Sequence, residues 1–544
     1  MSRSIETALL AALLFGAAPA SGLPAPPFEV PLRHRLYPFV ARIQVRSSDL
    51  PLFAQSRPYI RSDAAKLIRW VEKRVTEGAL VLSAGEEHDL DALRREFAAE
   101  LGRDVEGAGT EPYALVIEED GDRLVLDLYA SESYVAAGDE ATEALDLTAS
   151  TTTVGGHMRA TLGGRLALSA DVRNTRLQGS SGRSTFVARH GPPSTKAGEE
   201  GEFQDSADGY AAISTPIADL SIGKSLLDWG PGRSGRLLLG SDSYAFDQIR
   251  LTRALGPLRF VAVHGWVRGD HEPRYLAAHR IEAKIHPRLS LGGGEAVVYG
   301  QTDRLESERE RGGFQLEYLL PLFPLHVAEH YLGDLDNNLM SFDAFWLPVD
   351  GLALWGELLI DDFNTSRAWN HFGNKLGWVG GARAVFGSTG IDAGIEYSRL
   401  DPWVYTHRLD GHSYTHFDRS LGHWLLPNSD EIRGDLGWRP IGALSLECSF
   451  SILRYSVGHT ADGIGGYFVP DTERLDPSTY DTPKNAFTGT IETTRELELR
   501  AEWEPFYECF LRVEAARLEI ENLGNSAGED LSDSRIGVGL RVER

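Results

Sequence analysis

Two hydrophobic periodicities divide the chain into a short helical region and a long β region. Across residues 24–119, apolar side chains recur at the i, i+3, i+4 spacing of amphipathic helices. One helix is predicted to be capped by Ser62 and to end at Gly78. The capping-box pattern Ser83-Ala-Gly-Glu86 predicts the start of a second helix, with Gly102 as its stop. Both helices are short, so we expect them to pack against the rest of the chain.

From about Leu115 onward the period changes to two. In residues 165–173 one face carries leucine, alanine and valine and the other carries arginine, serine and aspartate. The same alternation recurs in roughly 16 to 18 segments, separated by turns rich in Gly, Asp and Pro, and it closes the chain with Ile536, Val538, Leu540 and Val542. At Ala515-Ala516 the alternation slips phase, which predicts a β-bulge.

The first twenty residues have the pattern of a secretory signal peptide. An apolar run from Ala8 to Ala18 is followed by the cleavage motif Ala18-Pro-Ala20. No later stretch is apolar over 18 residues, so the mature chain is either soluble or inserted in a membrane as a closed barrel. Densely charged polar faces suit a wet lumen and favour the barrel over a soluble sandwich or propeller. We therefore expect a signal peptide at 1–20, a periplasmic helical region at 21–120 and an outer-membrane barrel at 121–544.

The amino-acid composition and the absence of catalytic motifs argue against several classes of protein. With 79 acidic and 54 basic residues the net charge is −25, which argues against a nucleic-acid partner. The two cysteines exclude a disulfide-stapled scaffold. The chain contains no Gly-x-Ser-x-Gly elbow, HExxH helix or P-loop, so the sequence predicts neither an enzyme nor a cofactor.

Several sequence blocks resemble the capsule assembly protein Wzi family. The most specific is Asp228-Trp-Gly-Pro-Gly232 followed by Arg236-Leu-Leu-Leu-Gly-Ser-Asp242. Further similar blocks occur in the expected order, namely Ser56-Arg-Pro-Tyr59, Tyr275–Arg280, Gly294–Tyr299, Gly333–Asn338, Glu357–Phe363, Tyr405-Thr-His407, Tyr414-Thr-His416, Leu421-Gly-His423 and Pro427–Glu431. The resemblance spans roughly residues 50 to 500. It implies a mainly β protein, a transmembrane antiparallel barrel of about 18 strands with a small N-terminal α-helical periplasmic region, acting in capsule or exopolysaccharide assembly at the outer membrane.

Aromatic and histidine side chains are the candidate glycan contacts. A ring stacks on the apolar face of a sugar, while neighbouring polar groups bind its hydroxyls. The candidates are Trp229, Trp403, Tyr405, His407, Tyr414, His416 and Trp424. Two alternatives stay open: Trp229 packs within a rigid Gly-Pro-Gly turn, and the later aromatics form the interfacial girdle of the barrel.

Two polar clusters raise the question of a metal. Asp334, Asp336, Asn337 and Asn338 offer oxygen ligands, but the spacing of a calcium loop is absent. Histidines 407, 412, 416 and 423 do not have the spacing of a compact zinc site. The sequence therefore predicts no metal site in either cluster.

We accordingly expect a non-enzymatic, monomeric outer-membrane protein that contacts outer-membrane lipid and binds or organises surface polysaccharide. The first alternative is a porin-like channel for acidic or neutral solutes. The second is a secreted soluble β enzyme that acts on glycans.

Overall fold

The computed structural model describes most of the chain. The described residues are 25–102, 113–138, 147–179, 195–198, 201–269, 273–300, 313–321, 324–332, 336–363, 371, 373–407, 410–457, 486–487 and 489–543. The predicted signal peptide lies outside these residues. None of the helices in the described part of the chain is long and apolar enough to cross a membrane.

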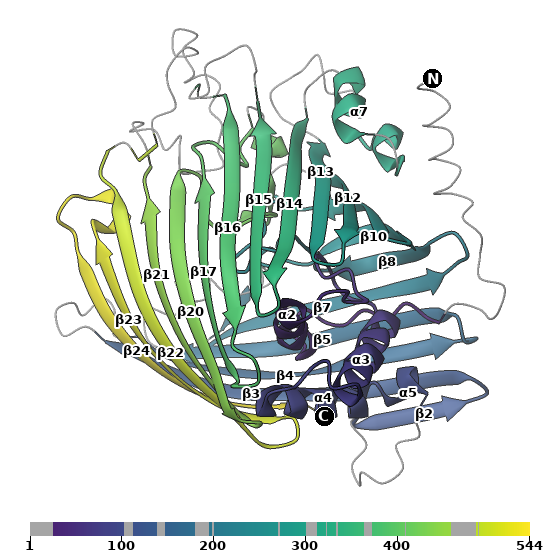
Figure 1. The fold of residues 1–544 in the computed structure, drawn as a ribbon. Coiled ribbons are helices and arrows are strands. Elements are labelled where there is room, and N and C mark those ends of the chain that lie inside the picture. Colours follow the sequence, from purple (N-terminus) through teal and green to yellow (C-terminus); the bar gives the residue numbers. More distant parts are fainter. Residues whose placement is uncertain are drawn as a thin grey trace.

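Eighteen antiparallel strands close into a barrel, with β3 paired to the last strand, β24 (Figure 1). This confirms the predicted fold class. In chain order the strands are β3 (Asp122–Gly138), β4 (Leu147–Leu162), β5 (Leu166–Gly179), β7 (Gly201–Ser214), β8 (Asp219–Ser225), β10 (Phe246–Leu255), β11 (Leu258–Val267), β12 (Arg274–His286), β13 (Leu289–Gly300), β14 (Asn337–Val349), β15 (Leu352–Asp362), β16 (Lys375–Val385), β17 (Ile391–Leu400), β20 (Ser429–Ile441), β21 (Leu444–Tyr455), β22 (Glu492–Phe506), β23 (Cys509–Glu521) and β24 (Leu531–Glu543).

Short pairings extend this wall or lie off it. β2 (Leu115–Glu119) pairs with β3, and β6 (Thr195–Gly198) pairs with β7. Two small sheets are separate from the barrel: β1 (Ser56–Arg57) with β9 (Asp228–Trp229), and β18 (Thr415–His416) with β19 (Arg419–Ser420). Single turns of 3-10 helix occur at η3 (Leu316–Leu319), η4 (Asp410–His412) and η6 (Leu523–Asn525).

The two ends of the barrel differ in their connections. One end has turns of two to five residues, such as 256–257 and 442–443, and is called here the short-turn end. The other end, the long-loop end, carries connections such as 226–245 and 401–428. Both the helical region and the C-terminal end of β24 lie at the short-turn end (Figure 1).

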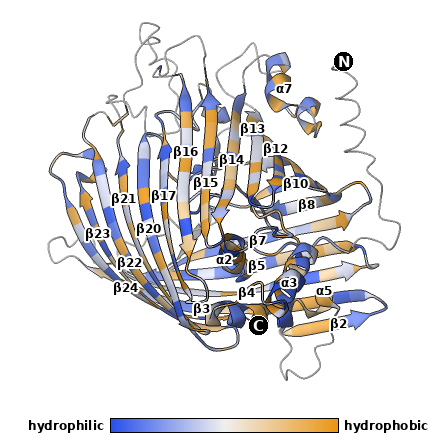
Figure 2. Cartoon of the chain, viewed as in Figure 1, coloured by the Kyte–Doolittle hydropathy of each residue, from blue (hydrophilic) through white to orange (hydrophobic). Residues whose placement is uncertain are grey.

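The outer face of the barrel is an apolar belt. Exposed apolar side chains of neighbouring strands lie directly opposite one another, as Val513 lies beside Val538 and Leu511 beside Leu540. Figure 2 shows the resulting alternation of apolar and polar residues along the strands. Near the short-turn end the exposed residues include five aromatics, namely Trp346, Phe386, Trp438, Trp503 and Phe506. An apolar belt bordered by a ring of aromatics is the surface that a lipid bilayer selects.

The predicted bulge at Ala515-Ala516 is wrong. β23 pairs with both neighbours there without a register shift. The phase changes because Leu518 and Ile520 turn their side chains inward, while Glu519 and Arg517 lie on the outer face. Charged residues on the outer face mark the level at which this strand leaves the apolar belt.

The N-terminal region is helical, as its periodicity predicts. It contains α2 (Leu36–Arg46), α3 (Arg61–Thr76), α4 (Ala84–Glu96) and α5 (Ala98–Leu101). The capping box of Ser83 and Glu86 forms at the start of α4. The predicted cap at Ser62 is wrong, because α3 begins at Arg61 with Ile60 as its N-cap residue, two residues before Ser62. One apolar core joins these helices.

Candidate functional site

Two connections from the long-loop end fold into the lumen and pack against each other. They are residues 226–245, between β8 and β10, and the described residues 401–407 and 410–428, between β17 and β20. Their buried apolar side chains join inward-facing wall residues in one core, to which the loops contribute Leu227, Trp229, Leu237, Leu238, Leu239, Val404, Tyr405, Tyr414, Leu421 and Leu425. We call these two segments the lumenal plug. A hydrophobic core inside a barrel holds its loops as firmly as a protein interior does.

Carboxylates on the wall hold the first plug segment through its backbone. Glu357 of β15 accepts hydrogen bonds from the backbone N–H groups of Gly232, at 2.6 Å, and Leu237, at 3.0 Å. Glu396 of β17 accepts from the backbone and hydroxyl of Ser234, at 2.7 and 2.6 Å. Buried N–H groups that would otherwise lack acceptors are thus satisfied by charge-assisted bonds.

Two tyrosines join the plug segments to each other. The Tyr405 hydroxyl donates to the Leu237 carbonyl at 2.5 Å, and the Tyr414 hydroxyl donates to the Leu238 carbonyl at 2.7 Å. Their rings stack with centroids 5.5 Å apart. Burial raises the pKa of both hydroxyls, so they remain protonated donors.

The N-terminal region reaches into the lumen and pairs with the plug. Ser56 of β1 lies opposite Trp229 of β9, and the backbone N–H of Gly230 donates to the carbonyl of Gln55 at 2.9 Å. Arg57 donates to Asp228 at 2.7 Å. A segment anchored at the short-turn end therefore contacts a loop that starts from the long-loop end.

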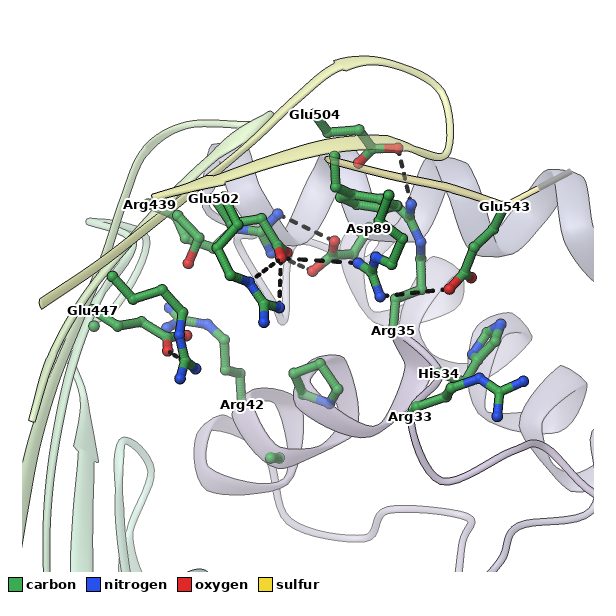
Figure 3. A pocket seen from close by; sticks show the side chains of 18 of the residues that line it. Arg33, His34, Arg35, Arg42, Asp89, Arg439, Glu447, Glu502, Glu504 and Glu543 are labelled. Atoms are coloured by element: carbon green, nitrogen blue, oxygen red, sulfur yellow. Dashed lines mark hydrogen bonds and ion pairs between the residues drawn. The ribbon is translucent and has the colours of Figure 1, made fainter. Parts of the chain in front are cut away.

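A cavity of about 760 Å³ lies between the helical region, the plug and the wall. Its lining is dominated by arginines and carboxylates. Figure 3 shows Arg35 and Asp89 of the helical region facing Glu504 and Arg439 of the wall. Arg35 lies 2.9 Å from Glu504 and 3.1 Å from Glu508. Arg439 donates to Asp89 through two of its nitrogens, one of them at 3.2 Å.

Burial perturbs titratable groups at this cavity and inside the plug. Desolvation raises the pKa of Glu508, in the turn between β22 and β23, to about 7, although Arg35 opposes the shift. Desolvation and the neighbouring Arg383 lower the pKa of Arg233 in the plug to about 10. Burial, with a contribution from Arg236, lowers the pKa of His423 to about 3, so this imidazole is neutral at physiological pH.

Most of the predicted glycan contacts are buried in the plug. Trp229, Tyr405, Tyr414 and His416 are buried, so their side chains offer almost no surface to a sugar. For Trp229 this is the packed-turn alternative that the sequence left open. The girdle alternative is wrong for residues 403–424, because this segment leaves the wall and enters the lumen, whereas the girdle is formed by aromatics at strand ends.

Three predicted residues keep accessible surface. Trp424 is 40% exposed and lines the lumenal cavity. Trp403 and His407 are partly exposed, and the His407 ring lies 5.6 Å from that of His412.

The four histidines at positions 407, 412, 416 and 423 do not converge on one point. Within the described ranges, the one group of His, Cys, Asp or Glu side chains that could converge on a metal is His326, Glu329 and His330.

A partly exposed aromatic cluster at the long-loop end was missed by sequence reasoning. The Phe417 ring, 40% exposed at the tip of the β18–β19 hairpin, lies 6.0 Å from the Tyr244 ring. The Arg419 guanidinium lies 4.4 Å from the centre of the Tyr244 ring. We call Tyr244, Phe417 and Arg419 the hairpin cluster. A signal was present, because Phe417 directly follows the predicted His416 and Arg419 lies three residues after it, but Tyr244 is contributed by the other loop.

The comparisons with known proteins agree with this architecture. The sequence matches no protein-family model and no curated protein sequence. The structure is similar to that of Wzi from Escherichia coli, described as a carbohydrate-binding β-barrel involved in group 1 capsule assembly. The two share 13% identity and superpose with a TM-score of 0.57 over 96% of this chain and 99% of that one.

More distant likenesses are to outer-membrane proteins of Pseudomonas aeruginosa. OprD has a TM-score of 0.43 and 11% identity over 77% of this chain and 95% of its own. OpdK has a TM-score of 0.43 and 12% identity over 77% of this chain and 99% of its own. The full-length superposition shows that this chain has the fold of the Wzi barrel, as its sequence blocks predict.

Proposed function

We propose that this chain is a non-enzymatic bacterial outer-membrane protein that binds or organises surface polysaccharide, in capsule or exopolysaccharide assembly, and acts as a monomer. The observation that carries the proposal is the lumenal plug. The loops that would frame the mouth of a pore fold inward and form a hydrophobic core with the wall. This leaves a rigid barrel that presents a surface at its long-loop end. The likeness to a carbohydrate-binding barrel over almost the whole of both chains supports the same function.

The hairpin cluster is the proposed point of contact with the polymer. Tyr244 and Phe417 offer ring faces and edges for stacking, and Arg419 offers donors for sugar hydroxyl or carboxylate groups. Each stacked ring contributes on the order of 1 kcal/mol beyond its buried area, so retention would depend on many repeated contacts along the polymer. Trp403, His407 and Trp424 are a second, more enclosed set. Trp229, Tyr405, Tyr414 and His416 act indirectly by holding the plug.

The test compares cell-bound with released polysaccharide. A deletion strain should shed polymer into the medium at unchanged total, and the wild-type gene should restore retention. Combined Tyr244→Ala and Phe417→Ala changes should cause shedding at unchanged barrel abundance. Phe386→Ala is the matched control, since Phe386 is also an exposed aromatic but lies at the short-turn end. Unchanged retention in the double variant would remove the hairpin cluster from the proposal. A Trp403→Ala, Trp424→Ala pair tests the second set in the same assay.

A porin-like channel remains the rival function, because a charged cavity of about 760 Å³ lies in the lumen. The plug predicts that the purified protein gives no steady conductance in a planar bilayer. Ohmic conductance by the wild-type protein, together with unchanged polymer retention in the deletion strain, would replace the proposal with the channel.

A further inference from the structure

Part of the outer wall is covered by protein instead of lipid. On β11, β12 and β13 the outward-facing residues include His264, His279 and Glu295, all largely buried. The described residues 313–321 and 324–332, which include η3 and α7 (Leu325–Leu332), lie over them: Phe314 contacts His264, with ring centroids 5.1 Å apart. Polar groups facing the apolar belt are costly in lipid, so a protein cover there stabilises the wall.

α7 is fixed on this wall by two kinds of contact. Leu325 and Ala328 are buried in an apolar cluster with Ala277 and Val297 of the wall. At the start of the helix, Glu295 accepts a hydrogen bond from the backbone N–H of His326 at 3.3 Å. Figure 1 shows α7 outside the barrel at its long-loop end.

The fixed helix brings together three metal-binding side chains. His326, Glu329 and His330 occupy positions i, i+3 and i+4, which share one helix face. Their ligand atoms all lie within 4.8 Å of one another, and the two imidazole centroids are 4.3 Å apart. His326 Nδ1 is 4.0 Å from Glu329 Oε2. Small rotations of the side chains would bring all three atoms to about 2.0–2.2 Å from one ion.

We propose that His326, Glu329 and His330 form a binding site for a divalent transition-metal ion of the zinc class. Two imidazoles and one carboxylate are a ligand set that suits Zn²⁺, and water would complete the four-coordinate shell. The nitrogen donors disfavour Ca²⁺ and Mg²⁺, which require oxygen ligands.

A metal ion at this site would stabilise α7 in its position over the barrel wall. An eight-residue helix is marginal in water, and an ion bridging residues four apart ties one full turn together. Glu329 is buried, so a cation beside it offsets part of the cost of burying its charge. The bound ion thereby holds α7 over the outward-facing polar residues.

The first experiment titrates ZnCl₂ into the purified full-length protein, free of any histidine tag, by isothermal calorimetry in detergent. We expect one equivalent to bind to the wild type, at least tenfold more weakly in His326→Ala and His330→Ala, and unchanged in His286→Ala. His286 is an exposed histidine at the opposite end of the wall, which makes it the matched control. CaCl₂ should not compete.

Folding of each variant is checked by its heat-modifiable migration on gels. As an independent readout, Zn²⁺ should slow amide exchange in α7 of the wild type and have no effect there in the His326→Ala, His330→Ala double variant. Equal zinc affinity in the wild type and the double variant, no zinc binding by the wild type, or equal displacement by Ca²⁺ would each overturn the proposal.

Discussion

At the scale of single residues, a few buried carboxylates decide where the plug lies. Glu357 and Glu396 accept bonds from backbone N–H groups that no secondary structure satisfies. Glu396 also accepts from the indole N–H of Trp355 at 2.6 Å. Their position in the wall therefore fixes the path of the first plug segment, which includes Trp229.

Replacing Glu357 by alanine should loosen the plug. Two buried N–H groups would lose their acceptor, each at a cost of roughly 1–3 kcal/mol. Protease added to the long-loop side of reconstituted vesicles should cut residues 226–245 faster than in the wild type. Glu447→Ala is the control, because Glu447 is a largely exposed wall carboxylate. Equal cleavage in both variants would show that Glu357 does not hold the loop.

The raised pKa of Glu508 predicts a pH dependence of helix docking. A carboxyl whose pKa rises from 4.5 to about 7 is favoured in its protonated form in the folded state. The contribution of Glu508 to docking should therefore be largest below about pH 4.5 and decline as the pH rises towards 7. The urea midpoint for loss of helical circular dichroism measures docking. Glu508→Gln should flatten its dependence on pH between these values, whereas the exposed Glu77→Gln should not. A wild-type midpoint that rises over this range, with the Gln variant behaving alike, would contradict the prediction.

At the scale of elements, period and capping chemistry predicted most of the architecture. The strands and α4 follow local rules, so their residues could be read without knowing the fold. α2 was not singled out, because its buried face carries Arg42 and Gln44 beside apolar residues. Arg42 can be buried because it pairs with Glu86 of α4 and with Asp392 of the barrel wall, which are both remote from it in sequence.

The candidate site was predicted far less well than the fold, and the reason is physical. Trp229 and Tyr405 are aromatic residues in polar loops, which is typical of ligand contact. Their burial depends on contacts between segments remote in sequence, such as Ser56 with Trp229 and Tyr405 with Leu237. No local pattern shows that a loop turns into a lumen.

The capping box of α4 provides a test at this scale. Ser83→Ala removes one cap bond and should lower the free energy of unfolding of the helical region by about 1 kcal/mol. Glu86→Gln should cost more, about 3–5 kcal/mol, because the buried carboxylate also pairs with Arg42 and Arg46. The urea midpoint of the helical signal gives both values, with the exposed Glu87→Gln as the control. A larger loss from Ser83→Ala than from Glu86→Gln would contradict this ranking.

At the scale of the whole molecule, the barrel encloses a second protein interior. Its outer face meets an apolar surrounding, and its lumen contains the plug core, the helical region and a charged cavity. The β1–β9 pairing joins the plug to the N-terminal region that contains the helices.

A cysteine pair across β1 and β9 should trap this connection. Arg57 and Asp228 lie directly opposite in an antiparallel pair, a spacing at which a disulfide can form. Arg57→Cys with Asp228→Cys should give a faster-migrating band on non-reducing gels. The background should be Cys448→Ser and Cys509→Ser, although both natural cysteines are free in the structure. Either single substitution should show no such band. Failure of the double variant to cross-link under oxidation would contradict the observed pairing.

The β1–β9 pairing also connects the two ends of the barrel mechanically. A polymer pulling on the surface loops would load Trp229 and Gly230, and the hydrogen bond from Gly230 to Gln55 passes that load to the chain that leads into α3. A pull on the long-loop end would thereby be borne at the short-turn end by helices that pack against the barrel wall.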